Sequence, residues 1–193
     1  VTSIGDGAFE GATSVTRVTF ASGSQLERIP SSAFRNATLL TFITIPESVT
    51  SIGSSAFYNA TALPSITIPA GVTSNGSQAF RDATALTSIV IPASVTSIGS
   101  SAFYEATMLN SVYFLGNAPT IGDSAFGSVA SGAKAFIRSD ATDFANVGVD
   151  WNGLVVEVGV YTVSYNTNGG STIAAQAYAR SIAAPAPPTR SGY

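Results

Sequence analysis

The side chains that this sequence offers for catalysis are carboxylates, hydroxyls, amides and guanidinium groups, because histidine and cysteine are both absent. Their absence removes the common nucleophile–base pairs, the zinc sites built from Cys and His, and any disulfide framework. A hydrolase that works with two carboxylates needs paired acids in one pocket, whereas the 11 acidic residues here are spread singly along the chain. We therefore expect no enzyme, no cofactor and no metal site.

The acidic residues suggest one candidate metal site, a calcium site at Asp140, Asp143 and Asp150. These three aspartates lack the D-x-D-x-D-G spacing of a strong calcium-binding loop. Ser139 and Asp140, with an acid three residues on at Asp143, match the start of a helix instead. We expect a short helix in this segment, with the acids acting as caps.

The composition and the lengths of the apolar runs argue against nucleic acid binding and against a membrane span. Charged residues make up 10% of the chain, the net charge is −3, and Lys134 is the single lysine. A surface that binds nucleic acid needs clustered Lys and Arg, so nucleic acid is not an expected partner. No apolar run approaches the roughly 20 residues that span a bilayer, so we expect no membrane span in this segment.

Two arginines and two tyrosines recur at a constant spacing of 23 residues: Arg35, Tyr58, Arg81 and Tyr104. If successive repeats stack about 4.8 Å apart, these side chains form a ladder in which guanidinium groups lie against rings. One interpretation is mutual stacking that covers the backbone beneath. The other is a ridge that binds a partner, because Tyr and Arg are enriched at interfaces.

A second candidate surface comprises strand residues that flank buried isoleucines, among them Phe42, Thr44, Thr67 and Tyr113. Their alternation with the isoleucines predicts that they point outward. Phe42 and Tyr113 stand out because exposed aromatic side chains are favoured anchors of interfaces. The alternative is that both are scattered surface aromatics without a partner.

All of these candidates depend on a repeat that is marked by Ala-Phe pairs. The phenylalanines are separated by 25 residues once and by 23 residues four times thereafter: Phe9, Phe34, Phe57, Phe80, Phe103 and Phe126. A period of this size predicts a solenoid, in which one unit stacks on copies of itself. Because a single unit cannot bury enough surface alone, the repeat must come as an array.

Each repeat contains a predicted strand, a corner and a turn. Ile43-Thr44-Ile45, Ile66-Thr67-Ile68 and Ile89-Val90-Ile91 alternate as half-buried strands do, and each is followed by a proline. A glycine four residues before most of the phenylalanines, such as Gly53, predicts a corner. Ser or Asp before each Ala-Phe pair predicts a cap, so we expect a short helix or 3₁₀ turn there.

Two positions interrupt the simple pattern. Asn75 occupies a position that is otherwise isoleucine, which predicts a local bend or a hydrogen-bonded asparagine. A flat array of hydroxyls, which suggests ice or glycan binding, is formed where Thr50, Thr73 and Thr96 line up beside Ser51, Ser74 and Ser97. Thr and Ser also suit exposed strand positions without any ligand.

The aligned repeats closely resemble the BspA-type leucine-rich repeat, whose pattern I-x-I-P-x-s-V-t-x-I-G-x-x-A-F is matched by five or six successive coils over residues 1–138. The resemblance implies a β-dominated leucine-rich repeat solenoid of stacked parallel strands. Alanine stands where the family usually carries cysteine, three residues after the phenylalanine. This exchange of one small buried residue for another leaves the expected fold unchanged.

Two shorter segments follow the expected solenoid. Residues 139–160, with Trp151, Leu154, Val155, Val156 and Val158, resemble the terminal segment of the same family and are expected to form a C-terminal cap. Residues 161–193, with Asn168-Gly169-Gly170 and Pro188-Thr189-Arg190-Ser191-Gly192-Tyr193, are similar to the Listeria–Bacteroides repeat, related to the B-repeat of internalins. That pattern normally continues further, so we expect an incomplete small β module.

The two resemblances together imply a non-catalytic bacterial protein, on the cell surface or secreted, that adheres to a protein or glycan partner. The alternative is a structural building block of a fibre, coat or stalk that binds copies of itself through its ends or flanks. Because Val1 lies in mid-repeat, we also expect the chain to be a segment of a longer protein, extracellular or at the cell surface.

Overall fold

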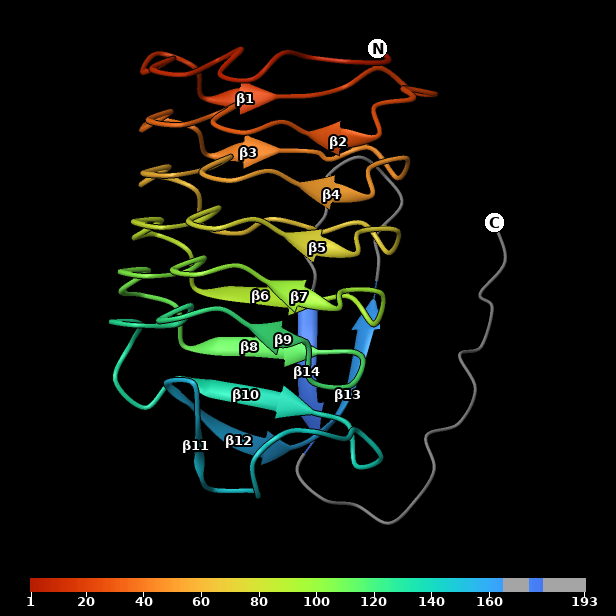
Figure 1. Cartoon of the computed structure of the whole chain (residues 1–193), viewed down its shortest axis with the longest axis vertical. Helices are drawn as coiled ribbons and strands as arrows, with labels where there is room; N and C mark the ends of the chain where they lie inside the picture. The colour runs from red at the N-terminus through yellow and green to blue at the C-terminus, as the bar shows by residue number, and fades with distance from the viewer. Residues whose placement is uncertain (165–173, 179–193) are drawn as a thin grey trace. The chain divides into compact units, whose positions relative to one another are not determined.

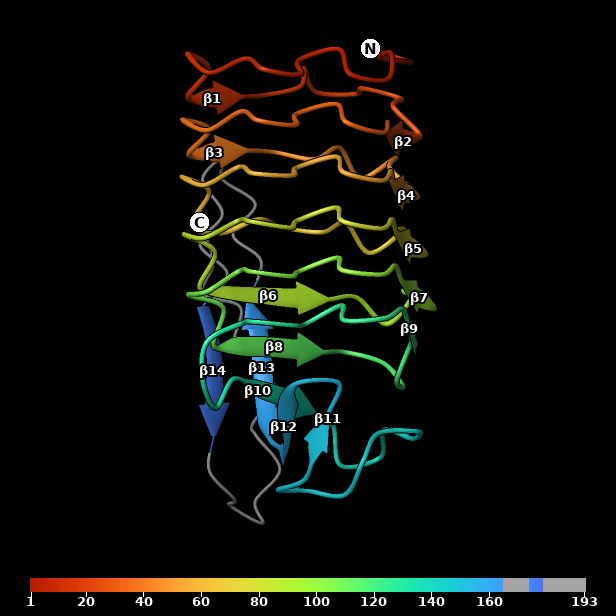
Figure 2. The ribbon, with the colours of Figure 1, turned by 60° about the vertical axis from the view of Figure 1, so that its left-hand side comes forward.

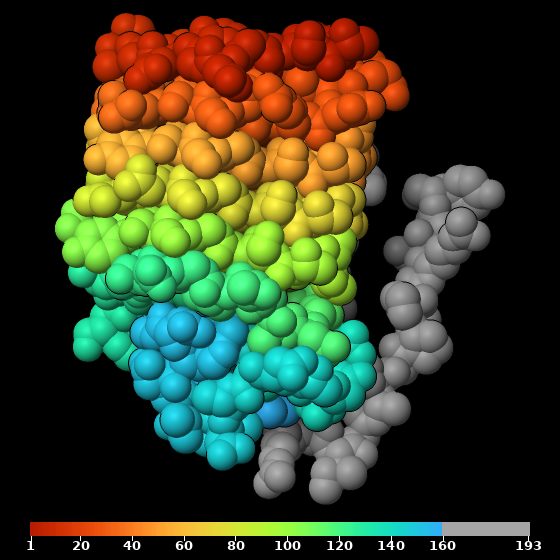
Figure 3. All heavy atoms as spheres, in the orientation of Figure 1, coloured from red at the N-terminus to blue at the C-terminus, as the bar shows by residue number. Residues whose placement is uncertain are grey.

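The structure is a computed structural model that describes residues 1–164 and 174–178. The chain divides after Val158 into two units, which are described separately. The first unit, residues 1–158, is a stack of coils in which the chain winds repeatedly around one hydrophobic core (Figure 1). In the space-filling view each coil forms a layer, and the layers follow one another in sequence order (Figure 3).

One face of the stack is built from parallel strands contributed by successive coils. These strands are β1 (Arg17–Val18), β3 (Phe42–Ile43), β6 (Ser88–Ile91), β8 (Ser111–Phe114), β10 (Lys134–Ile137) and β12 (Leu154–Val158). Strand β1 pairs with β3, while β6, β8, β10 and β12 form a continuous sheet (Figure 2). Strand β11 (Asp150–Trp151) joins this sheet at its far edge, antiparallel to β12. The predicted parallel stacking of coils is confirmed.

A second face carries a parallel sheet of five very short strands. They are β2 (Arg28–Ile29), β4 (Ser51–Ile52), β5 (Ser74–Asn75), β7 (Ser97–Ile98) and β9 (Thr120–Ile121). Neighbouring strands pair in register, so that each residue lies beside the residue 23 positions further along the chain, as Ser51 lies beside Ser74. The repeat period therefore sets the neighbours on this face as well.

The strand predicted at Ile66-Thr67-Ile68 is absent, although Ile66 and Ile68 are buried as expected. In the other coils the residue two positions before this segment donates its amide to the preceding coil, as Thr41 does to Thr16 and Thr87 does to Pro64. Pro64 occupies that position in its own coil and has no amide hydrogen to donate. The backbone hydrogen bonding between parallel strands is therefore interrupted between β3 and β6.

The predicted helix or 3₁₀ turn at each Ala-Phe pair is wrong, and the described residues contain no helix. Around Phe57, amides alternate between two kinds of acceptor. Ala56 and Tyr58 donate to carbonyls three residues back, whereas Phe57 donates to Ala79 of the next coil at 2.7 Å. Ser55 has φ 55°, as the third residue of a type II turn requires. In an α-helix the backbone amides donate to carbonyls of the same segment. Here every second amide donates to a carbonyl of the next coil instead.

The phenylalanines of these turns form one continuous stack through the core. Adjacent rings lie nearly parallel, with centroids 5.1–5.3 Å apart from Phe9 to Phe126. Phe34, Phe57, Phe80 and Phe103 are fully buried, whereas Phe9 in the first coil is 40% exposed. The core positions predicted from the repeat are confirmed, and the rings couple each coil to its neighbours.

Asn75 breaks the column of isoleucines inside the second sheet. It pairs in register with Ile52 on one side and Ile98 on the other, and it is 3% exposed. Neither its amide nitrogen nor its side-chain oxygen has a hydrogen-bond partner among the described residues. The predicted hydrogen-bonded asparagine is therefore wrong, and a buried amide without a partner costs stability.

We expect Asn75→Ile to stabilise the protein by about 2 kcal/mol, because it removes the unpaired amide and adds apolar contacts. Ile52 and Ile98 show that isoleucine fits this position in adjacent coils. Urea denaturation checks the free energy of unfolding, with Asn75→Ala as a control that removes the amide but leaves unfilled space. An Asn75→Ile variant less stable than the wild type would show that the amide has a stabilising partner.

The segment after β10 has no helix, so the helix predicted at Ser139–Asp143 is also wrong. Its backbone bonds to an earlier loop instead: Thr142 donates its amide to the side-chain oxygen of Asn117, and Ala118 donates to the Thr142 carbonyl at 3.0 Å. Asp140 pairs with Arg138 rather than acting as a cap. The Arg138 guanidinium lowers the pKa of the Asp140 carboxyl through this hydrogen bond.

The end of the first unit buries two residues of β12 against the last coil. Leu154 and Val156 are fully buried, whereas Val158 is exposed. Trp151 lies edge-on to Phe114, with ring centroids 5.4 Å apart, and packs against Phe144 at 4.7 Å. The domain boundaries expected at residues 138 and 160 stay predictions.

The second unit, residues 159–193, contains β13 (Val160–Ser164) and β14 (Ala174–Tyr178), which pair antiparallel. The Asn168-Gly169-Gly170 and Pro188–Tyr193 segments of the expected small β module lie outside the described residues.

Candidate interaction surfaces

The residue that follows each core phenylalanine points away from the core, and four of these residues form the Arg–Tyr ladder: Arg35, Tyr58, Arg81 and Tyr104. The Arg35 guanidinium carbon lies 5.1 Å from the centre of the Tyr58 ring. Arg81 lies between two rings, 5.9 Å from that of Tyr58 and 4.9 Å from that of Tyr104. The predicted stacking of guanidinium groups on rings is confirmed.

Residues of the preceding and the following coil contact the two ends of the Arg–Tyr ladder. Glu10 in the first coil forms an ion pair with Arg35 at 3.5 Å. At the other end, a β-carbon on Gly127 would come within 2.8 Å of the Tyr104 ring. The absence of a side chain at Gly127 lets this ring lie flat against the next coil. The ladder is therefore a continuous, ordered strip across the outside of the turns.

The guanidinium groups of this strip are held by rings more than by hydrogen bonds. The Nε atoms of Arg35 and Arg81 are buried and have no hydrogen-bond partner among the described residues. The Arg81 side chain is 30% exposed and lies 3.7 Å from the Asp82 carboxylate. No hydrogen bond from its terminal nitrogens is found within the described chain, so these donors remain for an acceptor on another molecule.

Polar residues run beside the ladder, one position further along each turn. Asn59 donates its side-chain amide to the side-chain oxygen of Asn36 at 3.0 Å. Both residues have φ near 60°, as do Asp82 and Glu105 in the following coils. Asparagine tolerates this left-handed conformation better than most residues. The ladder is thus bordered by amides in the first coils and by carboxylates in the later ones.

The strand face gives a mixed result for Phe42, Thr44, Thr67 and Tyr113. Phe42 is half-buried beneath Arg17, whose guanidinium carbon lies 3.9 Å from the ring centre. Thr44 and Thr67 are half-buried. The expectation that Tyr113 is exposed is wrong, because its side chain is 9% exposed and its ring stacks on Phe136 at 4.9 Å. Phe42 and Tyr113 lie three coils apart and form no common site.

The threonine hydroxyls in a row on the second sheet already donate hydrogen bonds to backbone carbonyls of the preceding coil. Thr50 donates to the carbonyl of Glu27, Thr73 to that of Thr50, and Thr96 to that of Thr73. A hydroxyl has one hydrogen to donate. Because these hydrogens already bridge adjacent coils, the row does not present free donors to a flat ligand.

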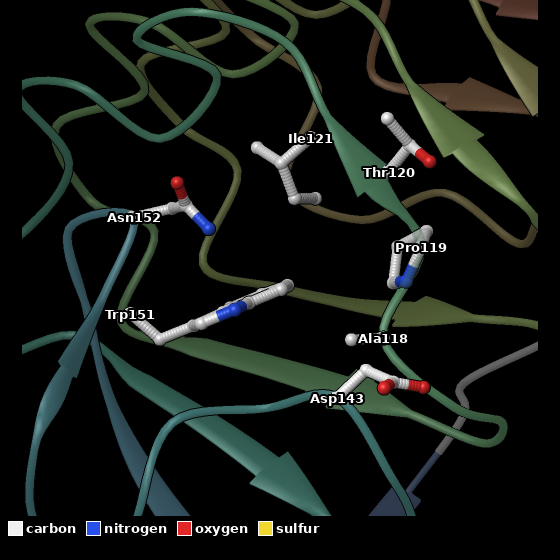
Figure 4. A pocket seen from close by; sticks show the side chains of 7 residues that line it. All are labelled: Ala118, Pro119, Thr120, Ile121, Asp143, Trp151 and Asn152. Atoms are coloured by element: carbon white, nitrogen blue, oxygen red, sulfur yellow. The ribbon is translucent and has the colours of Figure 1, made fainter.

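One pocket in the first unit was missed by sequence reasoning, which assigned its tryptophan to the expected C-terminal cap. It has a volume of about 430 Å³ and is lined by Ala118, Pro119, Thr120, Ile121, Asp143, Trp151 and Asn152 (Figure 4). These residues come from three separate segments, and no spacing in the sequence relates them. Among the described residues, no cluster of acidic side chains could hold a metal ion.

Parallel strands stacked at a fixed period around a Phe and Ile core define a leucine-rich repeat solenoid. Residues 2–133 match six copies of the BspA type leucine rich repeat region, and the chain belongs to this family. Proteins built on such repeats are typically used for protein binding. Within the described residues, no helix is long and apolar enough to cross a membrane.

Two solved structures share the fold. The chain is similar to a leucine-rich repeat protein of T. pallidum, with a TM-score of 0.55, 28% sequence identity, and coverage of 61% of this chain and 64% of that one. It also matches a leucine-rich repeat protein from Bacteroides ovatus, with a TM-score of 0.51 and 24% identity, over 81% of this chain and 55% of that one. The chain thus spans less than two thirds of either protein. No curated protein sequence matches it.

Proposed function

We propose that this chain is a non-catalytic binding segment of an extracellular or cell-surface bacterial protein, and that its Arg–Tyr ladder contacts a protein partner. The family is typically used for protein binding, and the similar solved structures are bacterial. The observation that carries the proposal is the ladder itself. It presents two arginines and two tyrosines that contact one another across successive coils.

The ladder has the physical properties of an interface hot spot. Tyr and Arg are enriched among the residues that dominate binding energy. Tyr58 and Arg81 already pack against each other between coils, so less side-chain entropy remains to be lost on binding. The terminal nitrogens of Arg81 supply donors for a backbone carbonyl or a carboxylate of the partner. A protein surface with an aromatic or acidic patch fits this chemistry.

Binding of the purified protein to a panel of extracellular matrix proteins, measured by biolayer interferometry, tests the proposal. We expect Arg81→Ala and Tyr58→Ala each to weaken binding at least tenfold, as substitutions at hot spots do. The free energy of unfolding should fall by about 1–2 kcal/mol in each variant, because Arg81 and Tyr58 each take part in two cation–π contacts, and one such contact on an exposed surface contributes about 0.5–1 kcal/mol.

Arg28→Ala is the matched control, since Arg28 is an exposed arginine on the second sheet and is paired with Asp6 rather than with a ring. It removes the same charge from a different face and should leave binding unchanged. Equal losses for Arg28→Ala and Arg81→Ala would show that the net charge matters and not the ladder, which contradicts the proposal.

Self-association is the alternative function. The exposed apolar side chains of Leu39 and Met108 on the turns favour it, because contact between the flanks of two copies would bury them. Light scattering at increasing concentration tests the idea, and a strictly monomeric protein would refute it. In either function, residues 161–193 would act as a Listeria–Bacteroides-type spacer module, as their resemblance to that repeat suggests.

A further inference from the structure

We propose that the pocket around Trp151 binds a neutral pyranose sugar. The site shares no residue with the Arg–Tyr ladder and goes beyond the proposed protein binding. Its lining combines one large aromatic side chain with a carboxylate, an amide and a hydroxyl, from Asp143, Asn152 and Thr120 (Figure 4). A pyranose offers the complementary surface, with apolar C–H groups on a ring face and hydroxyls at its edge.

The aromatic part of the pocket is rigid. Trp151 is fixed by Phe114, with ring centroids 5.4 Å apart at 89°, and by Phe144 at 4.7 Å. The indole remains half-buried and still lines the pocket. A ring that is already held in place stacks against a ligand without losing further conformational entropy.

Polar groups around the indole have unused hydrogen-bonding capacity. Asp143 accepts one hydrogen bond from the Thr142 hydroxyl at 2.8 Å through one of its two carboxylate oxygens. The side-chain amide of Asn152 and the indole N–H of Trp151 have no hydrogen-bond partner within the described chain. Together these groups supply both donors and acceptors, as a polyol requires.

The walls of the pocket are preformed by hydrogen bonds between segments that lie far apart in the sequence. The Ala118 amide donates to the Thr142 carbonyl at 3.0 Å, which joins the Pro119 wall to the Asp143 wall. The Gly153 amide donates to the Asp150 side chain at 3.2 Å and fixes the turn that carries Asn152. Most small-molecule sites are preformed in this way.

The lining argues against other ligand classes. No lysine or arginine lines the pocket, so an anion would lack a counter-charge. Asp143 is the only lining carboxylate, whereas calcium prefers six to eight oxygen ligands. The volume of about 430 Å³ accommodates one or two sugar rings. A ligand of this size in a shallow site should bind with a dissociation constant of about 1 mM.

Trp151 is the only tryptophan in the chain, so its fluorescence reports directly on the pocket. Titration with the methyl glycosides of glucose, galactose, mannose and N-acetylglucosamine, each to about 50 mM, tests the proposal. We expect a saturable fluorescence change with at least one of these sugars. An intact glycoprotein and its enzymatically deglycosylated form, added in parallel, distinguish glycan chains from free sugars as the source.

Two substitutions change the polar groups of the pocket without disturbing the turns. Asn152 has φ 56°, which glycine adopts freely, so Asn152→Gly deletes the amide and keeps the backbone. Asp143→Asn keeps the shape of the side chain and removes its charge. Each should weaken sugar binding at least tenfold, with an unchanged melting temperature, while Arg81→Ala on the ladder should bind sugar as the wild type does.

Absence of a saturable change with all four sugars would overturn the proposal. So would wild-type affinity in both the Asn152→Gly and Asp143→Asn variants, because the sugar would then bind elsewhere. Partner binding that stays unchanged in the Arg81→Ala and Tyr58→Ala variants, with sugar binding retained, would refute the proposed function alone, so the two can fail separately.

Discussion

Phe80→Ala should destabilise the protein by about 3–5 kcal/mol, the cost of deleting a fully buried phenylalanine. Phe80 is fully buried and stacks on Phe57 at 5.2 Å and on Phe103 at 5.3 Å. Its loss leaves a cavity in mid-stack and removes the ring contacts that couple the coils on either side. In an array held together by contacts between neighbours, such a break should also reduce the cooperativity of unfolding.

Phe9→Ala is the matched control for this substitution. Phe9 is 40% exposed and stacks on Phe34, so its loss should cost only about 1 kcal/mol. Urea denaturation monitored by circular dichroism gives both the free energy of unfolding and the slope with denaturant. Equal costs for the two variants would mean that the stack does not couple the coils.

Gly99→Ala is expected to have the second largest effect, a loss of about 3 kcal/mol, at the upper end of the usual cost of overpacking. A β-carbon on Gly99 would lie 2.4 Å from the Ser77 amide nitrogen and 2.6 Å from the Gly76 carbonyl carbon. Both contacts are with the backbone of the preceding coil, which cannot rotate away as a side chain can. The two coils would have to separate, which would strain the hydrogen bond from the Gly99 amide to the Asn75 carbonyl.

Gly71→Ala provides the comparison within the same chain. Its β-carbon would meet only ordinary van der Waals neighbours, the carbonyl oxygens of Val49 and Glu47 at 3.5 and 3.6 Å. This substitution should be neutral or stabilise by up to about 1 kcal/mol through the unfolded state. Thermal denaturation checks both variants, and a Gly99→Ala protein that melts at the wild-type temperature would contradict the steric argument.

The four corner glycines show which part of an explanation comes from the sequence and which part comes from the structure. The sequence locates Gly53, Gly76, Gly99 and Gly122, and predicts a corner from the conformational freedom of glycine. In the structure none of these four has a positive φ. They are required because adjacent coils approach too closely for any β-carbon, while the left-handed positions nearby are taken by Ser55 and Asn59.

Periodicity predicted the candidate ladder for a simple physical reason. When coils stack in register, residues 23 apart must be neighbours, so the contacts of Arg81 with Tyr58 and Tyr104 follow from counting. The burial of Tyr113 does not follow from counting in the same way. It depends on Phe136 in the next coil, where the repeat pattern has already decayed.

The sequence by itself determined the solenoid, the positions of its core side chains and which residues lie side by side in adjacent coils, because a fixed period dictates all three. Only the tertiary structure decided the conformation of the turns, since hydrogen bonds to the next coil compete there with local helical bonding. It also decided the Trp151 pocket, whose walls come from segments that no period relates. Contacts between equivalent positions can be read from a repeat, whereas contacts between non-equivalent positions require the folded chain.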